Sequence, residues 1–262
     1  MLRWSAGALA GGLLARATSC ATDDEEEAMT ATSSGGGRSG EGGRGRLRLD
    51  LGTPTGDVVP GTTSLGVTST RDALLRVPTG AGGAPSPLVL LLHGAGGDAA
   101  GGLSLLADLA DDAGLVLVAI SSRRATWDVL VDDYGVDVDH AARALRAASE
   151  KVHVDPGRLA IGGFSDGASY ALSLGLTNGD VFGHVLALSP GFAAPAEAVG
   201  RPRCFVSHGT QDAVLPIDRC SRRIVPRLRD GGYDVTYREF EGAHEVPPAI
   251  AREAVDWFTG GA

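Results

Sequence analysis

Short apolar runs alternate with amphipathic stretches along the chain from Leu65 onward. The runs have the length of strands, and the stretches between them repeat apolar residues at helical spacing. The pattern predicts strands at residues 74–77, 88–92, 115–120, 159–163, 184–188, 204–207 and 235–240, and helices at residues 98–113, 137–151, 166–177, 217–231 and 246–259. This alternation predicts a single α/β domain, with a mostly parallel central sheet and helices on both of its faces.

Two of the predicted strands are apolar almost without interruption, at residues 88–92 and 115–120. A strand covered by helices on both faces has no polar face, so these two runs are expected at the centre of the sheet. In such sheets, binding and catalytic residues collect in the loops that follow the carboxyl ends of the strands.

The N-terminus has a different pattern. Residues 1–20 begin with the basic Arg3 and continue without a charge from Trp4 to Ala15, which is shorter than the roughly 20 residues of a membrane-spanning helix. We therefore expect no transmembrane span. The stretch is typical of a signal peptide or of a lipoprotein signal ending at Cys20, and it favours export (periplasmic, lipid-anchored or secreted) over the cytoplasm. An apolar terminus without a targeting role is the alternative.

Residues 21–59 are predicted to be a flexible linker. Residues 21–46 contain an Asp-Asp-Glu-Glu-Glu run and a glycine-rich stretch, and their only apolar side chains are alanines and Met29. Such a segment cannot bury enough apolar surface to offset the entropy that folding costs. The folded domain is accordingly predicted to span residues 60–262.

Composition excludes several classes of function. The chain has 262 residues and a net charge of -9, so its field repels phosphate backbones and argues against a nucleic-acid partner. It has three cysteines without a CxxC pair and no histidine pair at helical spacing, so no metal site is predicted. No phosphate-binding P-loop is present either.

A candidate nucleophile lies in the segment Gly163-Phe164-Ser165-Asp166-Gly167, between a predicted strand and a predicted helix. The G-x-S-x-G pattern needs this context, because it places the serine on a sharp strand-to-helix turn where the hydroxyl is exposed above the sheet. The start of the helix also supplies free N–H groups for developing negative charge. We predict that Ser165 is the catalytic nucleophile.

An acid and a base follow in the order that this architecture requires, serine, then acid, then histidine. Asp212 stands in the loop after the strand at residues 204–207, and His244 follows the last strand. Asp212 would accept the imidazole N–H, and His244 would take the proton from Ser165. The rivals are Asp218 for the acid and His208 for the base, and the order of the three residues disfavours His208.

Backbone N–H groups are expected to stabilise the oxyanion of the reaction. The segment His93-Gly94-Ala95-Gly96-Gly97 directly follows a central strand, and its small residues let the main chain approach a substrate carbonyl. We assign the two donors to the backbone N–H groups of Ala95 and Asp166, and give His93 a supporting role. Three aromatic residues in neighbouring loops are candidates for the substrate pocket: Trp127, Tyr134 and Phe192.

The segments LLHGAGGD, GGFSDGASYAL, SHGTQDAVLPI and EGAHEVP together resemble the α/β-hydrolase superfamily of serine hydrolases. Within it they are similar to the bacterial phospholipase/carboxylesterase group and to polyhydroxybutyrate depolymerase and feruloyl-esterase-like proteins. The resemblance covers roughly residues 65–260. It implies hydrolysis of a small-molecule, lipid or aryl ester through an acyl-Ser165 intermediate, without a cofactor.

The substrate is constrained by the short connection from Ser189 to Pro202, about fourteen residues, which leaves no room for a large lid. An open site favours esters of short to medium acyl chains. The same triad would also serve a thioesterase, a lysophospholipase or an aryl or polyester esterase. A non-catalytic, ligand-binding relative of the same fold is the alternative from another class. The oligomeric state is not predicted.

Overall fold

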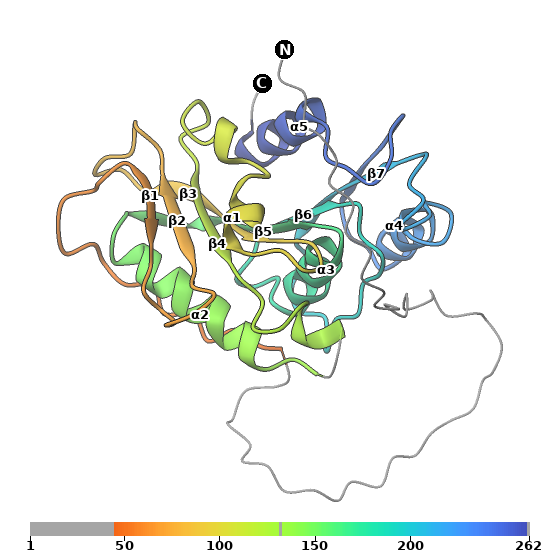
Figure 1. Ribbon diagram of the computed structural model, residues 1–262. Helices are drawn as coiled ribbons and strands as arrows, with labels where there is room; N and C mark the ends of the chain where they lie inside the picture. The colour runs from red at the N-terminus through yellow and green to blue at the C-terminus, as the bar shows by residue number, and fades with distance from the viewer. Residues whose placement is uncertain (1–44, 131–132, 261–262) are drawn as a thin grey trace, which may run out of the picture. The chain divides into compact units, whose positions relative to one another are not determined.

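Eight strands form one mixed sheet in the computed structural model of the protein, which describes residues 45–130 and 133–260 (Figure 1). The strand order is β1-β2-β4-β3-β5-β6-β7-β8. The strands are β1 (Gly61–Ser64), β2 (Leu74–Val77), β3 (Ser86–Leu92), β4 (Val116–Ile120), β5 (Val154–Phe164), β6 (His184–Leu188), β7 (Arg203–Gly209) and β8 (Val235–Phe240). Strands β3 to β8 are parallel, whereas β2 runs antiparallel to both β1 and β4.

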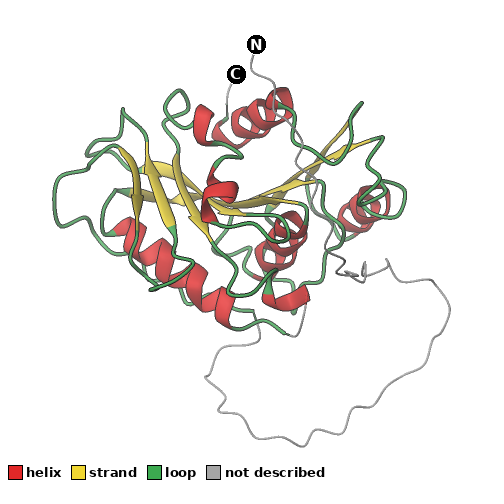
Figure 2. Cartoon of the chain, viewed as in Figure 1, coloured by secondary structure: helices red, strands yellow, loops and turns green. Residues whose placement is uncertain are grey.

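Helices cover both faces of this sheet (Figure 2). One face carries α2 (Val136–Ser149), α3 (Asp166–Thr177) and α4 (Ser221–Asp230), and the other carries α1 (Ala99–Leu103), the short 3-10 helix η1 (Ala107–Leu109) and α5 (Pro248–Thr259). A second 3-10 helix, η2 (Asp128–Leu130), lies in the loop between β4 and α2. The predicted α/β class, the mostly parallel sheet and the two helical layers are confirmed.

Burial on both faces explains why the central strands have a continuous apolar sequence. In β3, Leu88, Leu90 and Leu92 pack toward α2, α3 and α4, while Val89 and Leu91 pack toward α1 and α5. All five side chains are buried. Successive residues of a strand point to opposite faces, so a strand with a helical layer on each side needs apolar residues at every position.

Two elements differ from the prediction. The helix expected over residues 98–113 is broken into α1 and η1. Asp98 caps α1 by accepting a hydrogen bond from the backbone N–H of Gly101 at 2.9 Å, but the two glycines at 101 and 102 are poor helix formers, and the helix ends at Leu103. Strand β1 was not predicted because its sequence, Gly-Thr-Thr-Ser, lies at an exposed edge and carries no apolar alternation.

Packing begins before residue 60, inside the predicted linker. Leu47 is buried, and its backbone N–H donates to Asn178 Oδ1 at 2.7 Å. Arg46 pairs with Asp180, with Nη2 and Oδ2 2.6 Å apart. Leu47, Leu49 and Leu51 pack on the core at every second position. This alternation is the signal that the average composition of residues 21–59 concealed. Residues 1–44, with the predicted signal and the rest of the linker, lie outside the described residues.

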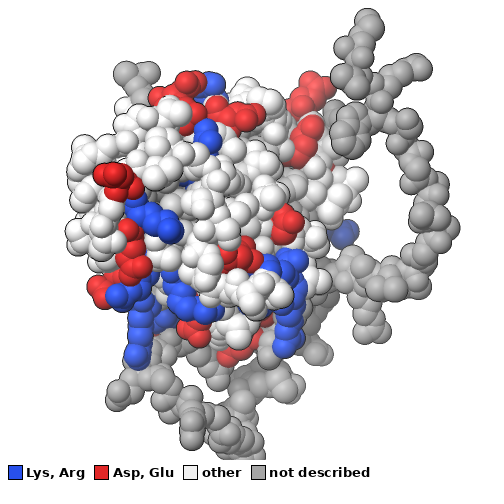
Figure 3. All heavy atoms as spheres, turned by 60° about the vertical axis from the view of Figure 1, so that its left-hand side comes forward, with Lys and Arg blue, Asp and Glu red and all other residues white. Residues whose placement is uncertain are grey.

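The surface is mixed in charge. On the face shown in Figure 3, acidic and basic side chains are interspersed among uncharged atoms, although the whole chain carries a net charge of -9. Within the described ranges, we find no helix of the length and hydropathy that a membrane crossing requires.

Candidate active site

The carboxyl ends of the parallel strands bring four separate loops to one edge of the sheet (Figure 1). These are the loops after β3, β5, β7 and β8, and they carry Ala95, Ser165, Asp212 and His244 respectively. Every residue predicted for the reacting centre therefore lies at the edge where sheets of this class place their functional loops.

Ser165 lies on a sharp turn between β5 and α3. Its backbone has φ 58° and ψ −122°, a conformation that a residue with a side chain adopts at a cost of about 1 to 3 kcal/mol. The turn is held by a hydrogen bond from the Ser165 N–H to the Leu188 carbonyl oxygen, 3.0 Å long. The strain lifts the hydroxyl out of the strand and toward the edge of the sheet.

The two glycines of the motif are needed because three backbones meet below this turn. A Cβ atom at position 163 would lie 2.6 Å from the carbonyl oxygens of Gly167 and Leu92, and one at position 167 would overlap the Leu92 carbonyl oxygen. No side chain fits at either position. The sequence motif therefore records a close approach of β3, β5 and α3.

Ser165, His244 and Asp212 form a hydrogen-bonded line. His244 Nε2 lies 2.8 Å from Ser165 Oγ, although the residues are 79 positions apart, and His244 Nδ1 lies 2.6 Å from Asp212 Oδ2. A carboxylate only accepts hydrogen bonds, so Nδ1 carries the imidazole proton and Nε2 is left to accept the proton of the serine hydroxyl. This is the tautomer that a general base needs.

Asp212 is held on its other oxygen by the backbone. Its Oδ1 accepts hydrogen bonds from the N–H groups of Val214 at 2.9 Å and Leu215 at 2.8 Å, and its side chain is fully buried. The rival acid, Asp218, has a side chain that is 78% exposed, and it pairs with Arg222 instead. The structure thus brings Asp212 to His244 and leaves Asp218 outside the site.

The loop of His244 lies directly on the end of β7. Gly209 makes this possible, because a Cβ atom there would meet the carbonyl oxygens of Gly242 and Ala243. The rival base, His208, is next to this glycine and approaches Asp212 instead of Ser165: its Nε2 lies 3.2 Å from Asp212 Oδ2. Among the hydrogen bonds of the described residues, none joins His208 to Ser165.

The N–H groups assigned to the oxyanion belong to two segments next to Ser165. Asp166 is the first residue of α3, and Ala95 is in the loop after β3. Neither N–H has a hydrogen-bond acceptor among the described residues, so both are available to a substrate oxygen. Gly94 brings the loop close to the nucleophile, since a Cβ at this position would lie 3.4 Å from Ser165 Cβ.

His93 supports the loop from below. Its Nε2 accepts a hydrogen bond from the Ser122 N–H at 2.9 Å, so the proton lies on Nδ1, which donates to the Gly94 carbonyl oxygen at 2.6 Å. Burial lowers the pKa of His93, which keeps the ring neutral and this pattern intact. The supporting role predicted for His93 matches this geometry.

Residues of the loop after β4 complete the support, and the sequence did not reveal them. Gly96 donates its N–H to the Ala125 carbonyl oxygen at 2.8 Å, and Thr126 Oγ1 donates to Asp166 Oδ2 at 2.7 Å. The two segments that carry the assigned oxyanion donors are therefore tied to residues 125–126. The signal for this is weak, because a threonine and a backbone carbonyl carry no chemical motif.

Two buried carboxylates fix the shape of that loop. Asp137 accepts hydrogen bonds from the N–H groups of Arg123 at 2.7 Å and Asp128 at 2.9 Å. Asp128 accepts from the N–H groups of Gly135 at 2.8 Å and Asp137 at 3.0 Å. Burial, and after it the neighbouring Asp128, raise the pKa of Asp137 to about 6, although the hydrogen bond from the Arg123 N–H lowers it.

The predicted pocket residues separate into two groups. Trp127 is 0% exposed, donates from Nε1 to the His93 carbonyl oxygen at 3.0 Å and stacks on Tyr170, so its assignment to the pocket is wrong. Tyr134 donates to the Ala194 carbonyl oxygen at 2.7 Å, beside the second half of α3 and away from Ser165, so it is also a packing residue. Phe192 is half-buried in the loop after β6, at the edge that carries Ser165.

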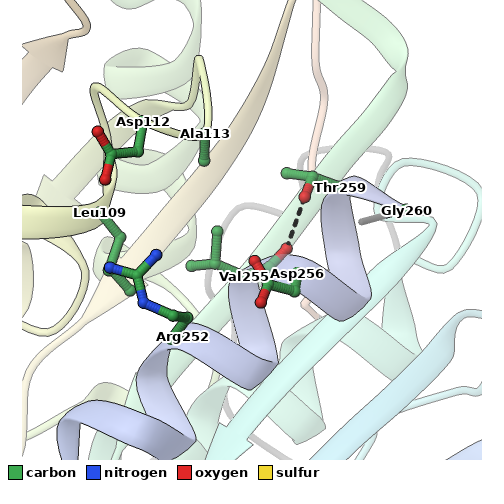
Figure 4. Close-up of a pocket in the computed structure, with 8 residues that line it drawn as sticks. All are labelled: Leu109, Asp112, Ala113, Arg252, Val255, Asp256, Thr259 and Gly260. Atoms are coloured by element: carbon green, nitrogen blue, oxygen red, sulfur yellow. Dashed lines mark hydrogen bonds between the residues drawn. The ribbon is translucent and has the colours of Figure 1, made fainter. Parts of the chain in front are cut away.

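A separate hollow lies at the opposite edge of the sheet (Figure 4). The hollow has a volume of about 330 Å³ and is lined by residues from the end of η1 to the loop before β4 and by the last turns of α5: Leu109, Asp112, Ala113, Arg252, Val255, Asp256, Thr259 and Gly260. None of them belongs to the candidate site. Within residues 45–130 and 133–260, no group of three or more His, Cys, Asp or Glu side chains is arranged to hold a metal ion.

Comparison with known proteins identifies the architecture. The profile of the phospholipase/carboxylesterase family matches residues 138–257. Acyl-protein thioesterase 1 of Gibberella zeae is 29% identical over 103 residues, and this match covers 36% of the chain and 43% of that protein. The chain thus matches less than half of the length of this relative.

Solved structures with the same fold include two esterases. Esterase PE8 is 24% identical, with a TM-score of 0.57 over 72% of this chain and 97% of that one. The carboxylesterase of Bacillus cereus is 16% identical, with a TM-score of 0.56 over 72% of this chain and 94% of that one. The chain thus has the α/β-hydrolase fold, and over residues 138–257, which include Ser165, Asp212 and His244, it resembles the phospholipase/carboxylesterase family.

Proposed function

We propose that the protein is a serine hydrolase that cleaves carboxylic esters through an acyl-Ser165 intermediate. The observation that carries the proposal is the hydrogen-bonded line from Ser165 Oγ through His244 to Asp212, with distances of 2.8 and 2.6 Å. The match to the phospholipase/carboxylesterase family and the esterases among the structures of the same fold support the same chemistry.

The first half of the reaction forms the acyl-enzyme. Ser165 Oγ attacks the ester carbonyl carbon while His244 Nε2 accepts the hydroxyl proton, and Asp212 stabilises the imidazolium that results. The carbonyl oxygen becomes an oxyanion, which the N–H groups of Ala95 and Asp166 bind. The bond to the alcohol oxygen then breaks, and His244 returns its proton to the departing alcohol.

The second half releases the acid. A water molecule gives a proton to His244 Nε2 and attacks the acyl carbon, and the same two N–H groups bind the new oxyanion. The bond to Ser165 Oγ breaks, Ser165 takes back the proton, and the carboxylic acid leaves. Both halves use the same base, His244, whose Nε2 lies 2.8 Å from Ser165 Oγ.

The surroundings of Ser165 favour esters with short to medium acyl chains. Residues 189–202, which connect β6 and β7, contain no helix, so this connection provides no helical lid over the site. Phe192, half-buried in this connection, is the proposed apolar contact for the substrate. A small-molecule, lipid or aryl ester fits these features, and export of the chain remains a further proposal.

A thioesterase is the second candidate, on the same three residues. The match to a protein named acyl-protein thioesterase 1 favours it, over 103 residues. Esters and thioesters form the same acyl-serine intermediate, so only their relative rates separate the two candidates.

The test is a comparison of the full chain with its Ser165→Ala variant on nitrophenyl esters of increasing acyl length and on matched acyl thioesters. We expect kcat/KM to fall at least about 10⁴-fold in the variant, with the best substrates among the shorter acyl chains. Equal activity of the two proteins would refute the proposal, and the ratio of ester to thioester rates decides between the two candidates.

A further inference from the structure

His208 is a second histidine beside Asp212, and it approaches the same carboxylate oxygen as His244. It is fully buried at the end of β7, and its ring is held at both nitrogens. Nε2 lies 2.7 Å from the Leu215 carbonyl oxygen and 3.2 Å from Asp212 Oδ2, and Nδ1 lies 2.6 Å from Ser221 Oγ. The proposed reaction does not use this ring.

The partners fix the protonation state of the ring. Nε2 faces two groups that only accept hydrogen bonds, so it carries the proton. Nδ1 then accepts a hydrogen bond from the hydroxyl of Ser221, the first residue of α4. Burial lowers the pKa of His208, with His244 acting in the same direction, while Asp212 and the Leu215 carbonyl oppose them. Glu239 on β8 pairs with His208 in the sheet register.

These contacts form a closed loop around Asp212. Leu215 donates its N–H to Asp212 Oδ1 at 2.8 Å, and its carbonyl oxygen accepts from His208. His208 in turn reaches Asp212 Oδ2, the same oxygen that accepts the His244 proton. The ring therefore contacts both the carboxylate and the loop residue that orients it.

We propose that His208 is a positioning residue: it holds the 212–215 loop through the Leu215 carbonyl oxygen and keeps its Nε2–H 3.2 Å from Asp212 Oδ2, so that the carboxylate stays aimed at His244. This inference rests on the proposed function. It places two more residues behind the line of three, with His208 in contact with Asp212 and Ser221 hydrogen-bonded to His208.

An apolar residue of similar size at position 208 would fill the space without making these polar contacts. It would leave the Leu215 carbonyl oxygen and the Ser221 hydroxyl buried without a partner, and it would remove the polar N–H that lies 3.2 Å from Asp212 Oδ2. The carboxylate charge would then act more strongly on His244 and favour its protonated, inactive form. Loss of His208 is therefore expected to change the pH dependence of the reaction as well as its rate.

The experiment compares three variants of the full chain, His208→Met, His208→Gln and Ser221→Ala, with His153→Gln as the matched control. His153 directly precedes β5, at the opposite edge of the sheet. Each protein is titrated with a fluorophosphonate to count active sites, and kcat and KM for a short nitrophenyl ester are measured against pH.

We expect His208→Met to lower kcat per titrated site about tenfold, with KM within about twofold of the wild type. The acid limb of its rate profile should move to higher pH by about half a unit. His208→Gln offers an amide N–H near the place of Nε2 and should recover most of kcat, Ser221→Ala should move the limb less in the same direction, and His153→Gln should change neither quantity.

An acid limb that stays in place in all three variants, or equal losses in His208→Met and His208→Gln, would overturn the inference. Should His208→Met fail to fold, the limbs of the other two variants decide it. Failure of the proposed function is a separate result, because it would leave the Ser165→Ala variant as active as the wild type.

Discussion

The two sides of Ser165 are built in different ways. On one side, side chains contact side chains: His244 reaches Ser165, and Asp212 reaches His244. On the other side, the groups proposed to bind the oxyanion are the backbone N–H groups of Ala95 and Asp166, in segments that a neighbouring loop holds in place. The first side depends on which residues are present, and the second depends on how a backbone is supported.

The two sides also differ in which contacts orient their reacting groups. Asp212 is oriented by two N–H groups of its own loop, three residues away at most. The Ala95 loop is oriented by contacts from a different loop, the one after β4, since Gly96 bonds to Ala125 and His93 bonds to Ser122. The oxyanion side should therefore respond to changes farther from the reacting atoms than the triad side does.

The largest effect is expected on the triad side. Asp212→Asn places an amide opposite His244 Nδ1 and favours the wrong tautomer, so kcat should fall about 10⁴-fold. Asp218→Asn is the matched control, because this exposed carboxylate belongs to the same loop region but lies outside the line. Steady-state kinetics on a nitrophenyl ester measure both. A larger loss in Asp218→Asn than in Asp212→Asn would exchange the roles assigned to them.

The next effect concerns the stability of the loop behind the oxyanion side. The buried Asp137 has its pKa raised from 3.8 in the unfolded chain to about 6, so folding favours its protonated form. This contribution is complete below about pH 4 and is lost as the pH rises through 6, so it should add about 2 to 3 kcal/mol to the free energy of unfolding between pH 7 and pH 4.

Denaturant unfolding of the wild type and of Asp137→Asn, measured across this range, isolates the contribution, because the variant lacks it. The contribution of Asp72 to the free energy of unfolding changes in a different pH range. Burial works to raise its pKa, but hydrogen bonds from Ser64 and from backbone N–H groups lower it to about 2, so its contribution is lost below about pH 4. Parallel curves for the two proteins between pH 4 and pH 7 would contradict the assignment to Asp137.

A smaller effect should follow from the hydroxyl that ties Asp166 to the loop. Thr126→Val removes the donor to Asp166 Oδ2 while keeping the shape of the side chain. We expect kcat to fall about tenfold with little change in KM, since the Asp166 N–H stabilises the transition state more than the bound substrate. Thr62→Val on the exposed strand β1 is the control. Equal kinetics in both variants would show that the tie has no role in the reaction.

The smallest effect is expected at Tyr134. Tyr134→Phe loses the hydrogen bond to the Ala194 carbonyl oxygen and should lower the free energy of unfolding by about 1 kcal/mol. Activity on every acyl chain length should stay unchanged, because the ring packs beside α3. A changed chain-length profile would restore Tyr134 to the substrate pocket.

The sequence predicts the features that depend on residue type, and it does not predict those that depend on how the backbone is supported. The sheet and helices were predictable because apolar runs such as Leu88–Leu92 have no other stable placement than a strand buried on both faces. Ser165, Asp212 and His244 were predicted because each has a side chain that can take part in acyl transfer and each lies in a loop directly after a strand. The strained turn at Ser165 was implied by the glycines at 163 and 167.

The remainder was not predictable, for physical reasons. Nothing in the letters of Thr126 or Ala125 shows that they hold oxyanion donors, because that role arises from a tertiary contact. Trp127 lies in the loop after β4, at the edge of the sheet that carries Ser165, but its ring points inward and contacts His93 and Tyr170. Leu47 was concealed by the polar residues around it.

The most direct test of the central claim is covalent labelling. The full chain is treated with a fluorophosphonate, digested and mapped by mass spectrometry, beside the His244→Ala variant. The geometry predicts one adduct on Ser165 and labelling at least about 10³-fold slower in the variant, because Ser165 then lacks its base. An adduct on another serine, or equal labelling rates in the two proteins, would contradict it.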